Sequence, residues 1–121
     1  KTIVFLDACF SGGARNKELL SLRGVKVKPK QNSLKGNIIV FASSSDTESS
    51  QPYNEKKHGL FTYFFLKKIQ DTQGNLTFKE LFDYTKENVS LESILNKNQS
   101  QTPTLIISPD VEKIWSSWKL N

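Results

Sequence analysis

Two short apolar runs of similar character recur along the chain. Residues 3–6 (IVFL) and residues 38–42 (IIVFA) are rich in β-branched and aromatic side chains and are too short for helices. We therefore predict two strands that are buried on both faces, the first spanning about residues 2–8. Each run stops abruptly in small or polar residues, DACFSGG after the first and SSSDTESSQ after the second. If the strands are parallel, these two loops lie side by side at one edge of the sheet.

Two later segments carry apolar side chains at helical spacing. Residues 60–70 (LFTYFFLKKIQ) predict a helix packed on the sheet, with its lysines outside. A second helix begins at Thr77, because Glu80 stands three residues later and the pair forms the pattern of a capping box. Its apolar face continues to Val89, and residues 91–95 either extend the helix or form another turn.

The last part of the chain predicts one more strand and one more helix. Residues 104–108 (TLIIS) read as a third short strand, and residues 111–118 as a C-terminal helix with Val111, Ile114, Trp115 and Trp118 on one side. The fold class is therefore α/β, with a mostly parallel sheet and flanking helices. A strand such as residues 3–6 needs neighbours on both edges, so we expect this chain to be the C-terminal part of a larger domain, incomplete on its N-terminal side.

Charge and composition narrow the classes of function. The net charge of +5 is concentrated in residues 15–35, which hold seven Lys and Arg but no aromatic residue. Without a stacking platform this segment does not suggest nucleic-acid binding, and we expect residues 14–37 to form a basic mobile loop or activation linker.

The single cysteine of the chain makes no internal disulfide. No apolar run approaches membrane-spanning length, so we expect a soluble protein, cytoplasmic rather than secreted, with neither metal nor other cofactor.

The strongest candidate chemistry follows the first strand. Asp7 and Cys9 are two residues apart, so on an extended segment both side chains point the same way. A lone cysteine is more often a packed small apolar residue than a nucleophile. A carboxylate so close discourages the reactive thiolate, which makes Asp7 a poor activator and a better binder of a cationic group.

These residues resemble a known family. DACFSGG resembles the catalytic-cysteine motif, D-x-C-x-S-G, of the caspase-like clan of cysteine peptidases, and in particular of metacaspases and bacterial caspase-domain proteins. The resemblance continues in chain order through nearly all of the sequence. Its further segments are VFASSSDTESS, HGLFTYFFLKKI, NLTFKELFDYTKENV and QTPTLIIS.

The resemblance implies a caspase-like fold and an endopeptidase with a Cys-His dyad. Cys9 would attack the scissile carbonyl, and the catalytic histidine would lie on a strand that precedes this chain. Asp7 and Asp46 would flank an Arg or Lys side chain of the substrate, although Asp46 is equally well explained as a turn-former. Glu48 is a weaker candidate for this pocket. Gly12 and the serines Ser43, Ser44 and Ser45 would line the substrate backbone or the oxyanion.

The only histidine of the chain, His58, is not expected to be the base. It follows Cys9 in the chain, whereas the family's histidine precedes the cysteine, and it stands at the start of an apolar helix. We interpret it as a residue of the helix N-terminus. Only an imidazole within hydrogen-bond reach of the thiol would reverse this view.

Three further expectations complete the sequence picture. The partners would be a peptide or protein substrate with Arg or Lys at the cleavage site, and the histidine-bearing N-terminal part of the same domain. The basic loop would be open to self-cleavage, at Arg23, Lys26, Lys28, Lys30 or Lys35. The alternatives are a catalytically inactive module on the same fold and a peptidase of the separase-like CHAT type. Calcium dependence, the natural substrate and the oligomeric state stay open.

Overall fold

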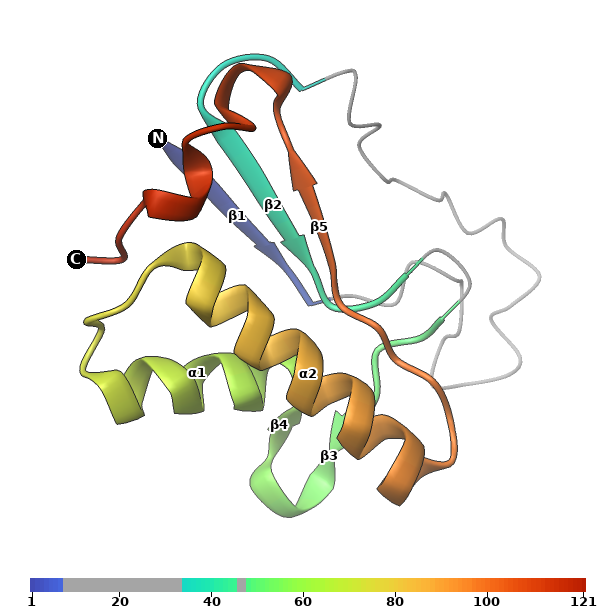
Figure 1. Ribbon diagram of the computed structural model, residues 1–121. Helices are drawn as coiled ribbons and strands as arrows, with labels where there is room; N and C mark the ends of the chain where they lie inside the picture. Colours follow the sequence, from blue (N-terminus) through green and yellow to red (C-terminus); the bar gives the residue numbers. More distant parts are fainter. Residues whose placement is uncertain (8–33, 46–47) are drawn as a thin grey trace.

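A computed structural model describes residues 1–7, 34–45 and 48–121 (Figure 1). Within these ranges a small mixed sheet packs against two helices, and a short hairpin precedes the first helix. The strands and α-helices, in chain order, are β1 (Thr2–Leu6), β2 (Ile38–Ala42), β3 (Pro52–Tyr53), β4 (His58–Gly59), α1 (Leu60–Thr72), α2 (Phe78–Lys97) and β5 (Thr104–Ile107).

The main sheet has the strand order β1-β2-β5. β1 and β2 are parallel, which is the condition under which we expected the loops after them to lie side by side. β5, however, is antiparallel to β2. The expectation of a mostly parallel sheet is therefore wrong for the described strands. The reason is the path of the chain: after α2 it returns at the end of β2, where Thr104 pairs with Ala42, so β5 has to run back along β2.

β2 is the central strand, and β1 is less buried than its sequence suggested. Residues 39–42 of β2 are between 0% and 3% exposed. In β1, by contrast, Phe5 is 39% exposed and Ile3, Val4 and Leu6 are only half-buried. Within the described residues β1 pairs with a strand on one side alone. The prediction that residues 3–6 are buried on both faces is wrong for this part of the molecule.

Both α-helices pack on the same face of the sheet. Ile39 and Phe41 point to this face, and their side chains join a core cluster with Leu60, Leu81 and Val89. Phe5 continues the cluster across β1, where its ring stacks on Phe41 at 5.0 Å between centroids. This single apolar layer holds α1 and α2 against the strands, and Figure 1 shows both helices on the same side of the sheet.

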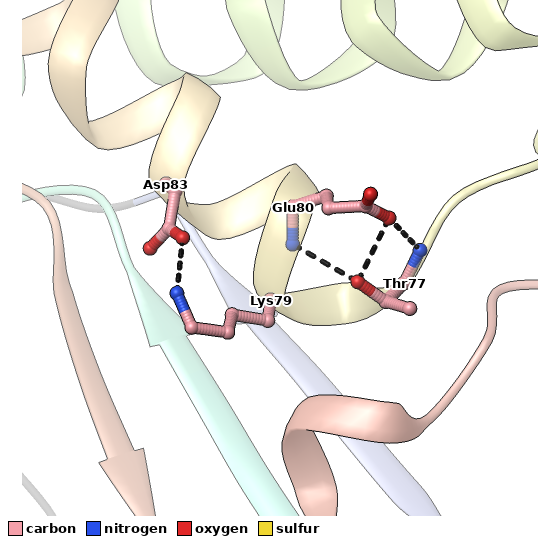
Figure 2. Close-up of polar contacts among 4 residues, drawn as sticks. All are labelled: Thr77, Lys79, Glu80 and Asp83. Atoms are coloured by element: carbon pink, nitrogen blue, oxygen red, sulfur yellow. Dashed lines mark hydrogen bonds and ion pairs between the residues drawn. The ribbon is translucent and has the colours of Figure 1, made fainter.

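The predicted capping box at the start of α2 is confirmed. The Glu80 amide donates to Thr77 Oγ1 at 3.2 Å, and the Thr77 amide donates to Glu80 Oε2 at 2.7 Å (Figure 2). One turn on, Lys79 and Asp83 form an exposed ion pair on the same helix. α2 continues through residues 91–95, so this stretch extends the helix and does not form a separate turn.

The C-terminal segment is not the α-helix that its apolar spacing predicted. Two short 3-10 helices, Pro109–Val111 and Trp115–Ser117, replace it. Trp115 and Trp118 are buried as expected, but Ile114 is 52% exposed. The physical reason is a tertiary contact: the Trp118 carbonyl accepts from the Phe78 amide at 2.8 Å, and this pairing requires an extended backbone at Trp118.

The hairpin of β3 and β4 is an element that the sequence pattern did not predict. Its strands are two residues long, so no alternation is visible, and Lys57 closes the turn with a φ of 58°. His58 lies in β4 and is exposed. It therefore precedes the helix as a strand residue, which corrects its interpretation as a helix N-terminal residue.

Candidate functional site

The carboxyl ends of β1 and β2 meet at one edge of the sheet. Leu6 pairs with Ala42, and the Ser43 amide donates to the Leu6 carbonyl at 2.9 Å. Asp7 follows directly on one strand and Ser43 on the other. The two segments that the sequence predicted to be neighbours thus leave the sheet side by side, and this edge is where open α/β folds bind ligands.

Several candidate residues lie outside the described part of the chain. They are Cys9 and Gly12 in the loop after β1, Asp46 in the loop after β2, and most of the basic segment of residues 14–37. Their roles stay predictions. Asp7, Ser43, Ser44 and Ser45 are described and can be placed.

Asp7 points from the end of β1 toward the start of α1. Its Oδ2 accepts a hydrogen bond from Thr62 Oγ1 at 2.5 Å. The same oxygen lies 2.6 Å from the position that a Cβ would take at Gly59, so only a residue without a Cβ fits there unless the carboxylate moves. Asp7 is nevertheless exposed. It is a carboxylate anchored on one side and open to solvent on another.

The serines after β2 are more buried than a substrate-lining loop would suggest. Ser43 and Ser44 are 0% and 1% exposed. The Ser43 hydroxyl bonds to the Ser50 hydroxyl, and its carbonyl accepts from Gln101 Nε2 at 2.8 Å. Both backbone polar groups of Ser43 are thus used within the protein, whereas Ser45 is only half-buried. Ser44 Oγ is buried with no hydrogen-bond partner in the described part of the chain.

Glu48 holds the loop after β2 to the segment before β5. Its carboxylate accepts from the Thr102 amide at 2.5 Å, from Ser100 Oγ at 2.8 Å and from the Ser45 amide at 3.3 Å. Burial alone would raise the pKa of Glu48, but the hydrogen bonds outweigh it and bring the pKa below its ordinary value of 4.5. With its oxygens engaged in this way, Glu48 supports the loop and is poorly placed to bind a substrate cation.

Acid is expected to weaken the hydrogen bonds by which Glu48 holds the loop after β2. Because the pKa of Glu48 is lowered by folding, its contribution to the free energy of unfolding is full above pH 4.5 and is lost as the pH falls through the folded-state value. Glu48→Gln should cost about 1 kcal/mol at neutral pH, a figure reduced for partial exposure. It should also make the loss of stability below pH 4.5 less steep. Thermal unfolding across this pH range measures both effects.

The matched control is Glu87→Gln on the exposed surface of α2. This variant removes the same charge but none of the hydrogen bonds of Glu48. Its free energy of unfolding should therefore fall with decreasing pH as steeply as that of the original protein. An equally steep fall of the free energy of unfolding in Glu48→Gln and in the original protein would contradict the assignment of this acid effect to Glu48.

Gln101 is a structural residue that sequence reasoning missed. Its side chain is 0% exposed. Its Nε2 donates to the Ser43 carbonyl, its Oε1 accepts from the Gln51 amide at 2.7 Å, and its own amide donates to Ser93 Oγ at 3.0 Å. One glutamine therefore joins the loop after β2, the end of α2 and the approach to β5. A single polar residue carries no periodicity, so the sequence holds no signal for it.

His58 and Asp7 lie on opposite sides of the hairpin strand β4. Successive strand residues point to opposite faces, and the Cβ position of Gly59 is the one that faces Asp7. His58 instead lines an open hollow of about 350 Å³ with Lys56, Tyr63 and Lys67. This placement favours the expectation that His58 is not the catalytic base, although the thiol to which its distance matters lies outside the described residues.

Comparison with known proteins decides the family. A family model described as the caspase domain, Peptidase C14, matches residues 1–112. The chain belongs to the caspase-domain family. Searches of curated proteins and of solved structures find no significant match.

Membership of this family confirms the resemblance at the level of the domain and carries a coarse function. The caspase domain implies peptidase-like activity of the C14 type, that is, a hydrolase of the cysteine peptidase class. The narrower assignment to metacaspases stays a prediction. In the described residues, no helix has the length and apolar character needed to cross a bilayer, and no three His, Cys, Asp or Glu side chains gather as metal ligands would.

Proposed function

We propose that this caspase domain belongs to a cysteine endopeptidase that cleaves after Arg or Lys. The observation that carries the proposal is the position of Asp7. Its carboxylate is anchored to α1 at the carboxyl edge of the sheet, exposed, and two residues before the only cysteine. A negative group beside the nucleophile disfavours the thiolate but stabilises a bound cation, so its use in this place is recognition.

In the proposed reaction Cys9 is the nucleophile. Its thiolate attacks the scissile carbonyl, and a histidine on a strand before Lys1 first takes the thiol proton and later delivers it to the leaving amine. The backbone amides around Cys9 and Gly12 would donate to the oxyanion. Water then hydrolyses the acyl-enzyme and restores the thiol.

Substrate binding is proposed for the two loops at the same edge. Asp7 and Asp46 would share the Arg or Lys side chain, since two carboxylates replace the lost hydration of a cation better than one. Among the serines, Ser45 is the best candidate to pair with an extended peptide, because it is half-buried whereas Ser43 and Ser44 are fully buried. A peptide would replace the two 3.3 Å hydrogen bonds that the Ser45 amide and carbonyl make with Glu48. The basic segment of residues 14–37 would offer cleavage sites to the same pocket.

Labelling of the full-length protein tests this proposal. A chloromethyl ketone that carries Arg should alkylate Cys9 at least tenfold faster than one that carries Asp, because an aspartate side chain would meet the carboxylate of Asp7. Mass spectrometry of the labelled peptide locates the modification. Faster labelling by the Asp reagent would reject basic specificity, and failure of both reagents would favour a catalytically inactive module on the caspase fold.

A further inference from the structure

The carboxylate of Asp7 is anchored by a residue of α1 that is fifty-five positions away in the chain. The contact is built by the first turn of that helix. Thr62 is the third residue of α1, and Gly59 is the residue that caps it without a side-chain hydrogen bond. The Leu60 amide donates to the Gln51 carbonyl at 2.9 Å, and no side chain of the cap serves the amides that follow it. A carboxylate from β1 at this end of the helix is therefore favoured by the helix dipole.

The two oxygens of Asp7 have different surroundings. Oδ2 accepts from Thr62 Oγ1 and lies 2.6 Å from the Cβ position at Gly59, whereas Oδ1 is 3.5 Å from that position. In the described part of the chain this hydrogen bond from Thr62 is the only one that Asp7 receives. Oδ2 is therefore the oxygen that is engaged by the first turn of the helix, and because Asp7 is exposed its carboxylate stays accessible to a ligand.

We infer that Thr62 is a positioning residue for substrate specificity, and that Gly59 makes the space in which it acts. The inference rests on the proposed function. An exposed carboxylate that rotates freely gains little from a cation, because the ordering of the side chain offsets the attraction. A carboxylate held at one oxygen presents the other in a fixed direction, which favours a directional partner such as a guanidinium.

A purely structural role for the same contact makes a different prediction. If Asp7 only caps α1, loss of the Thr62 hydroxyl lowers the stability of the fold and affects all substrates alike. If Thr62 orients Asp7 for the substrate, the loss falls on basic substrates alone. The ratio of two specificity constants separates these cases, since a general loss of folded enzyme cancels in it.

The test compares Thr62→Val, Thr62→Ser and the original full-length protein on two peptides that differ in one residue, Arg or the uncharged norleucine before the cut bond. Thr62→Val should lower the Arg-to-norleucine ratio of kcat/KM about tenfold, mainly through KM for the Arg peptide. Thr62→Ser, which keeps the hydroxyl, should restore the ratio. Thr72→Val makes the same change at the far end of α1 and should leave the ratio unaltered.

Gly59→Ala provides an independent second variant. The added methyl group would force Asp7 from its place, so the ratio should fall as it does in Thr62→Val. An unchanged ratio in Thr62→Val, with Arg still preferred by the original protein, overturns the inference and leaves the proposed function standing. Absence of Cys9-dependent turnover, or of any preference for Arg in the original protein, overturns the proposed function and the inference together.

Discussion

Replacing Cys9 by alanine is expected to abolish peptide hydrolysis by the full-length protein. In a covalent mechanism the sulfur forms the bond that splits one difficult step into two easier ones, and no neighbouring group can replace it. Loss of the nucleophile in enzymes of this type lowers kcat by about 10³-fold or more, to the level that binding and the oxyanion site supply alone. An Arg peptide with a fluorescent leaving group measures the rate.

Two controls give this experiment its meaning. Cys9→Ser replaces the thiol by a hydroxyl of similar size, so it separates the chemistry of the sulfur from its volume. Its rate should also be strongly reduced, because a serine without its own activating machinery is a weak nucleophile. Circular dichroism of both variants reports whether the domain remains folded. Hydrolysis that survives in folded Cys9→Ala would show that the activity does not use this sulfur, and the proposed function would be wrong.

The elements that the sequence predicted well are those with strong local signals. α1 and α2 show apolar periodicity over several turns, and the start of α2 is encoded by two residues, Thr77 and Glu80, that satisfy each other's backbone amides. β2 was predicted within its exact five residues because a short, β-branched apolar run between polar loops fits a buried strand. In these places local preference and tertiary structure agree.

The direction of β5 and the path of the C-terminal segment were wrongly predicted for one reason: a pattern of side chains does not contain the contacts that the backbone makes at a distance. The apolar run of β5 says nothing of its direction, which the exit of the chain from α2 decides. The spacing of Val111, Trp115 and Trp118 fits an α-helix, but the hydrogen bond between the Phe78 amide and the Trp118 carbonyl requires another path. Tertiary contacts override propensity where elements are short.

The same distinction applies to the candidate site. That Asp7 and Ser43 leave the sheet at one edge could be predicted, because parallel strands bring their carboxyl ends together. That Thr62 and Gly59 anchor Asp7 could not be predicted, because the contact joins positions far apart in the sequence and neither residue repeats in a pattern. The structural use of Glu48 could not be predicted for a similar reason, since two of its partners, Ser100 and Thr102, follow α2.

Phe41→Ala is expected to have the largest effect on stability among the substitutions considered. Phe41 is 1% exposed in the central strand. The centroid of its ring lies 5.0 Å from that of Phe5, 5.6 Å from that of Phe82 and 6.2 Å from that of Phe78. Phe41 therefore joins β1, β2 and α2. Truncation leaves a cavity that three elements border, and the free energy of unfolding should fall by about 3–5 kcal/mol. Chemical denaturation of the full-length protein measures it.

Phe5→Ala is the matched control, because Phe5 pairs with Phe41 across the strands but is 39% exposed. Its side chain already meets solvent, so the cavity is open and the loss should be about half as large.

β2 also leads directly into Ser43, whose amide joins the two strand ends. A core that loosens at Phe41 should therefore also disorder the edge that carries Asp7, and lower activity at temperatures where the protein is still folded. Equal losses of stability in Phe5→Ala and Phe41→Ala would contradict the central place given to β2.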